Sequence, residues 1–271
     1  MRVMIWGDME GVACIEVWEQ VNGGAPMYEE GRVLFTEEMN AAVRGAKLAG
    51  AGDIIVVDCH GAGGGWSFKS LIPERLESGA EYVFGYPWAM YVEPLREGVD
   101  AVIFVGAHAR AGTPDGVLCH TVSSESWQNA YINDVPVGES GILAAVCGVW
   151  NAPVAFVAGD TATCREVQDL LGESVVAAPV KVGLGRYAAR NRTPVEARRL
   201  IEEGVYRALK DRNWPEPYRP GAPVTFRVEV TTPDAVNQYR GRPGVTIEGA
   251  RTVASRGENF WEAWDQFWYR R

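Results

Sequence analysis

Short, uninterrupted runs of apolar residues, separated by helical patterns, restrict this chain to folds built on a largely parallel β-sheet. The four clearest runs cover residues 2–6, 53–58, 101–106 and 153–158. Several of them are apolar at nearly every position instead of alternating, which is typical of strands buried on both faces of a parallel sheet. Helices between such strands cover the two faces. We therefore expect an α/β fold of three layers with a largely parallel or mixed central sheet.

Helix and turn signals agree with this pattern. Residues 28–49 have the apolar periodicity of one long helix, and a capping box at 193–196, with proline at the first helical position, opens a helix that ends near residue 211. Residues 130–137 resemble a β-hairpin that turns at Asn133-Asp134, and a helix is expected from about residue 138 to 150.

Two lobes are predicted for the 271 residues. We assign residues 1–155 to a catalytic, metal-binding lobe and residues 156–271 to a smaller C-terminal α+β lobe. Four prolines in residues 214–223 indicate a linker or irregular loop, and residues 224–230 alternate as a half-exposed strand does. Near the C-terminus an aromatic stripe at helical spacing is expected to pack in the core or at a subunit interface. Its members are Phe260, Trp261, Trp264, Phe267 and Trp268.

Charge and composition argue against several classes of function. The net charge is −9, whereas nucleic-acid binding requires a concentrated basic surface, so no nucleic-acid partner is expected. No stretch approaches the 18 or so apolar residues that span a membrane, and the N-terminal apolar run is too short for a signal peptide. Five cysteines without the spacing of a disulfide scaffold indicate reduced thiols. A cytoplasmic protein without a membrane partner is therefore predicted.

Three predicted strands are followed by residues that bind metals. Asp8 and Glu10 follow the first strand, His60 follows the second and His108 follows the third. The carboxyl ends of parallel strands converge on one crevice, where ligands bind. Taken singly, each residue has a structural explanation as a loop cap, a solvated charge or a buried histidine. Together they favour a metal site of nitrogen and oxygen ligands, which suits zinc and also admits manganese or cobalt.

His120 is the third and last histidine of the chain. A Pro-Asp-Gly turn at residues 114–116 allows the chain to fold back toward His108. Because imidazole titrates near neutral pH, His120 could act as a general base, a general acid or a transition-state stabiliser. A histidine satisfied by backbone groups in a hairpin is an equal alternative. Asp58 likewise either orients His60 or is a satisfied acid at the edge of a loop.

Four motifs resemble those of the DppA-type D-aminopeptidase family of zinc metallopeptidases and occur in the order found in that family. They are Asp-Met-Glu-Gly at 8–11, Asp-Cys-His at 58–60, Gly-Ala-His-Ala-Arg-Ala-Gly-Thr-Pro at 106–114 and Tyr-Ile-Asn-Asp-Val-Pro-Val-Gly-Glu at 131–139. The resemblance implies a zinc-dependent aminopeptidase or amidohydrolase that cleaves small peptides, with N-terminal D-amino acids, by a water activated between two metals. It also implies a ring-like homo-oligomer, in this family a decamer.

The resemblance assigns a role to each matching residue. Asp8 would bridge two Zn²⁺ ions, Glu10 and His60 would complete the first site, and His108 and Glu139 would complete the second. Glu139 is identified by the resemblance alone, since from the residues it is only an acid in the first turn of a helix.

His120 matches the catalytic position of the family. One residue more, Asp115, separates it from His108 than in the family pattern. We expect this insertion in the turn to change the loop and to leave the role of His120 unchanged.

Two other functions fit the same ligand residues. A two-metal phosphoesterase would need a basic clamp for phosphate, and Arg110 is the one cation directly beside a ligand motif. A non-catalytic oligomer stabilised by metal would give His120 no purpose. An aminopeptidase therefore remains the leading hypothesis.

Overall fold

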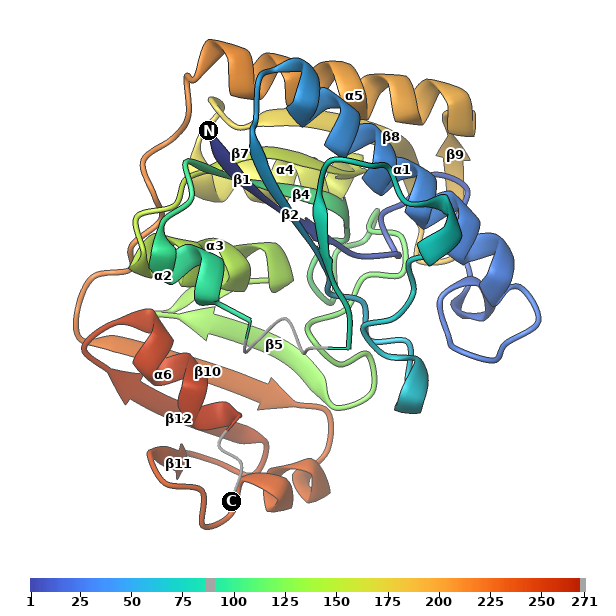
Figure 1. The fold of residues 1–271 in the computed structure, drawn as a ribbon. Coiled ribbons are helices and arrows are strands. Elements are labelled where there is room, and N and C mark those ends of the chain that lie inside the picture. The colour runs from blue at the N-terminus through green and yellow to red at the C-terminus, as the bar shows by residue number, and fades with distance from the viewer. Residues whose placement is uncertain (86–90, 269–271) are drawn as a thin grey trace.

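A seven-stranded sheet forms the centre of the computed structural model, which describes residues 1–85 and 91–268. Its strands lie in the order β3–β2–β1–β4–β7–β8–β9 (Figure 1). Neighbours are parallel except β9, which is antiparallel to β8. The prediction of a largely parallel or mixed sheet is therefore confirmed. The strands are β1 (Arg2–Gly7), β2 (Asp53–Asp58), β3 (Glu81–Val83), β4 (Ala101–Ala107), β7 (Val154–Asp160), β8 (Val176–Gly185) and β9 (Ala188–Asn191).

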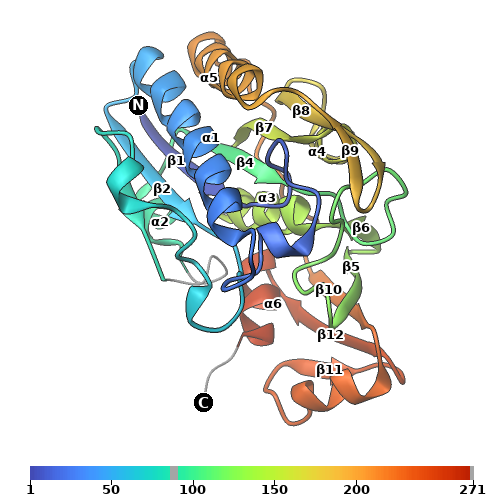
Figure 2. The same ribbon diagram turned by 90° about the vertical axis from the view of Figure 1, so that its right-hand side faces the viewer.

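Helices cover both faces of this sheet, so the expected three-layer arrangement is also confirmed (Figures 1 and 2). All residues of β4 and β7 are buried, as their continuous apolar sequences require. Helices α1 (Tyr28–Leu48) and α5 (Pro194–Asp211) pack together on one face. The opposite face carries α2 (Glu93–Glu97), α3 (Glu139–Val149) and α4 (Thr161–Leu171). No helix among the described residues has the length and apolar character needed to cross a membrane.

The predicted signals at the ends of α1 and α5 are present. The hydroxyl of Thr193 accepts a hydrogen bond from the Glu196 N–H, the Glu196 carboxylate accepts one from the Thr193 N–H, and Pro194 occupies the first turn of α5. At the end of α1, Gly50 has a φ of +86°, a backbone conformation that favours glycine. Within the described residues, short 3₁₀ helices lie in the connections, namely η1 (Trp18–Gln20), η2 (Gly64–Trp66), η3 (Pro73–Arg75) and η4 (Pro233–Tyr239).

A second, antiparallel sheet has the strand order β11–β12–β10–β5–β6 and lies below α3 in Figure 1. The predicted hairpin is the pair β5–β6, and its turn residues Asn133 and Asp134 have φ angles of 48° and 66°. These are the positive angles that such a two-residue turn requires. The strands are β5 (Trp127–Ile132), β6 (Val135–Val137), β10 (Val224–Val230), β11 (Val245–Ile247) and β12 (Thr252–Gly257).

The aromatic stripe lies on helix α6 (Phe260–Phe267), which packs on this second sheet. Phe260, Trp264 and Phe267 are buried, and the ring centroids of Phe267 and Phe226 are 4.9 Å apart. Of the two predicted alternatives, core packing within the chain therefore accounts for these three side chains.

The two sheets are interleaved along the sequence. β5 and β6 of the second sheet precede β7, β8 and β9 of the first, and β10 to β12 then complete the second sheet. The chain thus passes between the sheets three times. A boundary between two lobes at residue 155 stays a prediction.

Candidate metal centre

The carboxyl ends of β1, β2 and β4, which are neighbours in the sheet, bring three of the predicted residues together. Asp8 Oδ1 lies 2.9 Å from His60 Nδ1, and Asp8 Oδ2 lies 3.4 Å from His108 Nε2. The convergence expected from the strand ends is therefore present. Asp8 stands between the two imidazoles and presents one carboxylate oxygen to each.

Two glycines permit this close approach between the segments that follow β1 and β4. Gly106 has a φ of +71°, and a Cβ there would lie 1.9 Å from the Asp8 carbonyl oxygen. A Cβ on Gly11 would lie 1.9 Å from the Ala107 carbonyl oxygen, and the Gly11 N–H donates to the Gly106 carbonyl at 2.7 Å. Any side chain at either position would push Asp8 and His108 apart.

The hydrogen bonds of His60 define which ring nitrogen is free. Nε2 lies 2.8 Å from the Val21 carbonyl oxygen, which can only accept, so Nε2 carries the proton in the neutral ring. Nδ1 then directs its lone pair toward Asp8 Oδ1 and toward Glu10 Oε2, which is 3.2 Å away. A backbone carbonyl that fixes the tautomer in this way is the usual partner of a metal-binding histidine.

His108 is oriented in the same manner through the opposite nitrogen. Its Nδ1 donates to the Ala109 carbonyl at 3.0 Å, which leaves Nε2 free. Nε2 faces Asp8 Oδ2 and Glu139 Oε1, the latter at 3.1 Å. Glu139 is the first residue of α3, directly after the β5–β6 hairpin, so the structure brings it to the sheet edge as the family resemblance implied.

Glu10 is the most deeply buried carboxylate of the cluster, with 3% of its surface exposed, and its Oε2 accepts no hydrogen bond. Burial raises the pKa of a carboxyl group, but the positive charge of His60 outweighs burial and holds the pKa of Glu10 well below its usual range. A buried carboxylate oxygen without a donor is costly unless a cation binds it. Glu10 therefore has an oxygen available to a metal.

The cluster as a whole favours additional positive charge. Burial lowers the pKa of the His60 imidazole, but Glu10 and Asp8 outweigh burial and raise it well above its ordinary value. Glu139 and Asp8 do the same to the pKa of His108. Burial, reinforced by the neighbouring Glu10, raises the pKa of Asp8 to about 7. Cations bound between these groups would relieve the repulsion among the carboxylates.

His120 folds back onto the cluster, as the Pro-Asp-Gly turn suggested. Its ring stacks on the His108 ring with centroids 4.0 Å apart, and its Nδ1 donates to the Leu118 carbonyl at 2.9 Å. The free Nε2 lies 3.5 Å from Glu139 Oε1. His120 thus presents an unprotonated nitrogen to the same space as the predicted ligands.

The donor set fits metal binding in two overlapping groups. Within the described residues, Asp8, Glu10 and His108 have ligand atoms within 4.8 Å of one another, and so do His108, His120 and Glu139. Carboxylate oxygens and imidazole nitrogens are the ligands that zinc takes in catalytic sites. The second group shows that the position of His120 is compatible with coordination as well as with proton transfer.

Asp58 anchors the loop that follows β2 and does not contact the His60 ring. Its fully buried carboxylate accepts hydrogen bonds from the backbone N–H groups of His60, Ser70 and Leu71 at 3.2, 2.5 and 2.9 Å. Of the two predicted alternatives, the satisfied acid at a loop edge is therefore the one found. Asp58 acts on His60 through the backbone.

Lys181 anchors the loop after β1 from the other side, a role that the sequence did not reveal. Its buried ammonium donates to the carbonyls of Glu10, Val12 and Ile15 at 2.6, 2.8 and 2.6 Å. Burial lowers its pKa to about 8. Lys181 holds in place the segment that carries Glu10.

Replacing Lys181 with methionine is expected to lower the free energy of unfolding by about 3–5 kcal/mol, because three buried carbonyls lose their charged donor. The midpoint of urea denaturation of the metal-free protein, followed by circular dichroism, measures this. The same substitution at Lys210, an exposed residue of α5, serves as the control and should change the free energy by less than about 0.5 kcal/mol. Equal stabilities of the two variants would contradict the anchoring role.

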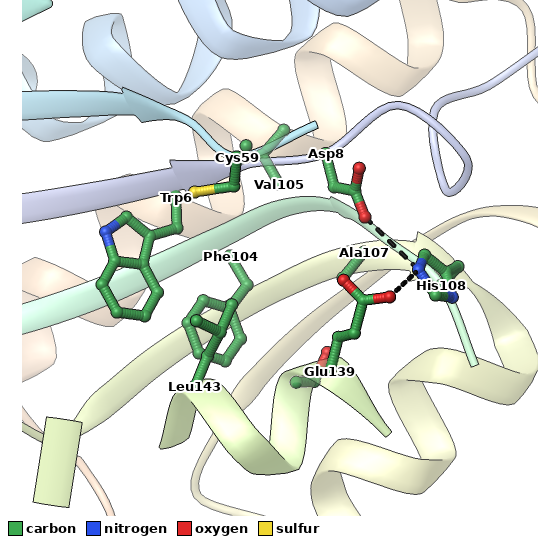
Figure 3. A pocket seen from close by; sticks show the side chains of 11 residues that line it. Trp6, Asp8, Cys59, Phe104, Val105, Ala107, His108, Glu139 and Leu143 are labelled. Carbon is green, nitrogen blue, oxygen red and sulfur yellow. Dashed lines mark hydrogen bonds and ion pairs between the residues drawn. The ribbon is translucent and has the colours of Figure 1, made fainter. Parts of the chain in front are cut away.

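An apolar pocket adjoins the cluster (Figure 3). Asp8, His108 and Glu139 lie at one end of it, and Trp6 and Phe104 lie at the other. Its free volume of about 20 Å³ is little more than that of one water molecule, so the pocket as it stands does not hold a ligand side chain. Arg110, by contrast, lines a different cavity together with Arg165, Glu166 and Asp169, which contains none of the predicted metal ligands.

Comparisons with known proteins point to one family. A family model described as D-aminopeptidase matches residues 1–269. A D-aminopeptidase of Bacillus subtilis (strain 168) is 32% identical over 267 residues, which cover 97% of this chain and 94% of that protein. The solved structure of the Zn-dependent D-aminopeptidase DppA from Bacillus subtilis, described as a self-compartmentalizing protease, superposes with a TM-score of 0.91. It is 30% identical, and the match covers 99% of this chain and 96% of that one.

Proposed function

This chain belongs to the D-aminopeptidase family, and we propose that it hydrolyses small peptides with an N-terminal D-residue at two Zn²⁺ ions held by the cluster at the sheet edge. It is thus a zinc-dependent aminopeptidase. In this proposal Glu10 and His60 would hold one ion, His108 and Glu139 would hold the other, and Asp8 would contribute a carboxylate oxygen to each. The observation that carries this proposal is the position of Asp8, whose two oxygens each face the free nitrogen of a different imidazole.

Zinc, when bound, polarises a peptide carbonyl and makes an associated water acidic enough to attack it at neutral pH. The residues of the chain orient the two histidines and supply negative charge to the site. The Val21 and Ala109 carbonyls hold His60 and His108 in the tautomers that leave the facing nitrogens free. Three carboxylates, from Asp8, Glu10 and Glu139, neutralise most of the charge of two divalent ions.

We assign proton transfer to His120. Its Nδ1 is occupied by the Leu118 carbonyl, so Nε2 is the atom that takes or gives a proton. Burial, followed by the positive charge of His108, lowers the pKa of His120, which keeps the ring neutral and able to accept. Its stacking on His108 keeps Nε2 close to the ligands without requiring it to be one of them.

A phosphoesterase is less well supported. Such an enzyme needs a cation facing the metals to clamp phosphate oxygens, and Arg110, the candidate from the sequence, lines a separate cavity. No observation on the described residues favours a purely structural metal site, since His120 brings a free imidazole nitrogen to it.

Metal content and paired substrates test the proposal. Purified protein is expected to contain about two zinc ions per chain, and a D-aminoacyl amide should be hydrolysed faster than its L enantiomer. Elemental analysis and steady-state kinetics measure these quantities. Removing zinc with a chelator should abolish turnover, and adding zinc back should restore it. Full activity in metal-free protein, or hydrolysis of phosphate esters in place of amides, would refute the assignment.

We further propose that the protein assembles into a ring-like homo-oligomer, a decamer in the manner of its family, and works in the cytoplasm. The name self-compartmentalizing, given to the similar structure from Bacillus subtilis, supports an assembly that encloses its sites. The five free thiols agree with a reducing compartment. The sedimentation coefficient of the zinc-loaded protein, far above that of a single chain, would support the ring.

A further inference from the structure

The turn between β8 and β9 brings an unpaired cation close to His120. Figure 2 shows this hairpin beside the segment that joins β1 to α1. Arg186 in the turn is exposed and, among the described residues, forms no ion pair. Its guanidinium carbon lies 5.5 Å from the ring centroid of Trp18 in η1. The edge of Trp18 in turn meets His120, with centroids 5.5 Å apart.

Two hydrogen bonds hold this turn in position. The Leu118 N–H donates to the Arg186 carbonyl at 2.8 Å, and the Leu118 carbonyl is the group that accepts from His120 Nδ1. The indole N–H of Trp18 donates to the hydroxyl of Tyr187 at 3.4 Å. The guanidinium also lies 5.7 Å from the Tyr187 ring. Arg186 is therefore attached to the same short segment that orients the proposed proton-transfer group.

The charges around the site are arranged asymmetrically. Carboxylates dominate the metal cluster, whereas Arg186 is a cation on the side of His120 where Trp18 packs. A peptide with free ends has the complementary arrangement, an ammonium group at one end and a carboxylate at the other. Such charge complementarity selects one orientation of the ligand.

The distances limit the length of the peptide. Through Trp18, the guanidinium carbon lies within about 11 Å of the His120 ring centre. An extended residue spans about 3.3–3.6 Å, so up to three residues beyond the cleaved bond cover this distance. The C-terminal carboxylate of a peptide of four residues is therefore within reach of Arg186.

We propose that Arg186 binds the C-terminal carboxylate of the substrate and thereby selects short peptides with a free carboxyl terminus. This role rests on the aminopeptidase function proposed above and adds to it a determinant of substrate choice. A guanidinium pairs with a carboxylate through two parallel hydrogen bonds, and the aromatic ring beneath Arg186 limits the positions that its side chain adopts.

A matched pair of substrates tests this role. One is a peptide of four residues with an N-terminal D-residue and a free carboxylate, and the other is the same peptide as its C-terminal amide. The zinc-loaded wild-type protein should have a lower KM for the acid. Arg186→Ala should raise KM for the acid about tenfold, with kcat and the KM for the amide changed less than about twofold, because one charged hydrogen-bonding partner is lost. Arg186→Lys, which keeps the charge, should recover part of the preference.

Arg190→Ala is the matched control, since Arg190 is an exposed arginine of the neighbouring strand β9, and it should leave both substrates unaffected. Equal KM values for acid and amide in the wild type would overturn the role of Arg186 while leaving the aminopeptidase function intact. A fall in kcat on both substrates in Arg186→Ala would also overturn it, because it would show that the residue only supports Trp18 and His120. Failure of the wild type to hydrolyse either peptide would refute the aminopeptidase function, and this role with it.

Discussion

Asp8→Ala is expected to remove zinc and peptide hydrolysis together. The two oxygens of Asp8 face the imidazoles of His60 and His108, so its loss takes a ligand and a negative charge from both proposed ions. Zinc per chain after dialysis should fall well below two, and kcat/KM should fall by more than about 100-fold, the upper range for the loss of groups that only support a ligand. Elemental analysis and kinetics on the same sample measure both.

Two further variants serve as comparisons for the losses of zinc and activity in Asp8→Ala. Asp58→Asn alters a carboxylate that reaches the cluster only through backbone N–H groups, so it should reduce activity by no more than about 10–100-fold and retain zinc. Asp211→Ala, at the exposed end of α5, should have no effect on either quantity. If Asp8→Ala retained two zinc ions, the bridging assignment would be wrong.

His120→Ala is expected to separate catalysis from metal binding. Proton transfer acts on the transition state, so kcat should fall by about 10²–10⁴-fold while zinc content stays near two per chain. His60→Ala and His108→Ala should instead lose zinc, because each removes a nitrogen ligand. The pH–rate profile of the His120 variant should also lose one limb where chemistry limits turnover.

Cys119→Ala is the neighbouring control for His120. The Cys119 thiol is buried and lies 3.5 Å from the Thr113 carbonyl, so it packs within the loop, and activity should stay within a few-fold of the parent. An inactive Cys119 variant that keeps its zinc would point to a thiol nucleophile. Loss of one zinc from His120→Ala would place His120 among the ligands, a position that its distance of 3.5 Å from Glu139 allows.

Much of the fold was predictable because its strongest signals are local. The buried strands β1, β2, β4 and β7 have continuous apolar sequences, and α1 and α5 have clear periodicity and end signals. The prediction did not include β8 or α4. β8 contains a proline and two glycines, residues that are unfavourable in strand interiors. Its place in the sheet depends on pairing with β7, which no local pattern reveals.

The residues of the candidate site also differ in whether local sequence was enough to predict their positions. Asp8, His60 and His108 were predictable because parallel strands deliver their carboxyl ends to one edge whatever lies between them. Glu139 reaches the site only because the β5–β6 hairpin returns the chain from the second sheet, and its local sequence is that of any acid at the start of a helix. Lys181 was out of reach for a similar reason, since its partners are backbone groups of a loop whose position depends on the whole fold. For the same reason the sequence left the role of Asp58 open between two alternatives.

The interleaving of the two sheets has a consequence for the biosynthesis of the enzyme. Glu139 follows the β5–β6 hairpin. The other edge of β5 pairs with β10, through residues 226–230 of β10. While the C-terminal part of the chain is still inside the ribosome, that edge has no partner, and Glu139, the last of the proposed ligands, has no fixed position. We therefore expect neither proposed ion site to be fixed early in synthesis, because the segment of Glu10 depends on Lys181 in β8 and the hairpin before Glu139 depends on β10. A peptidase made in this way gains its activity only when its synthesis is nearly complete.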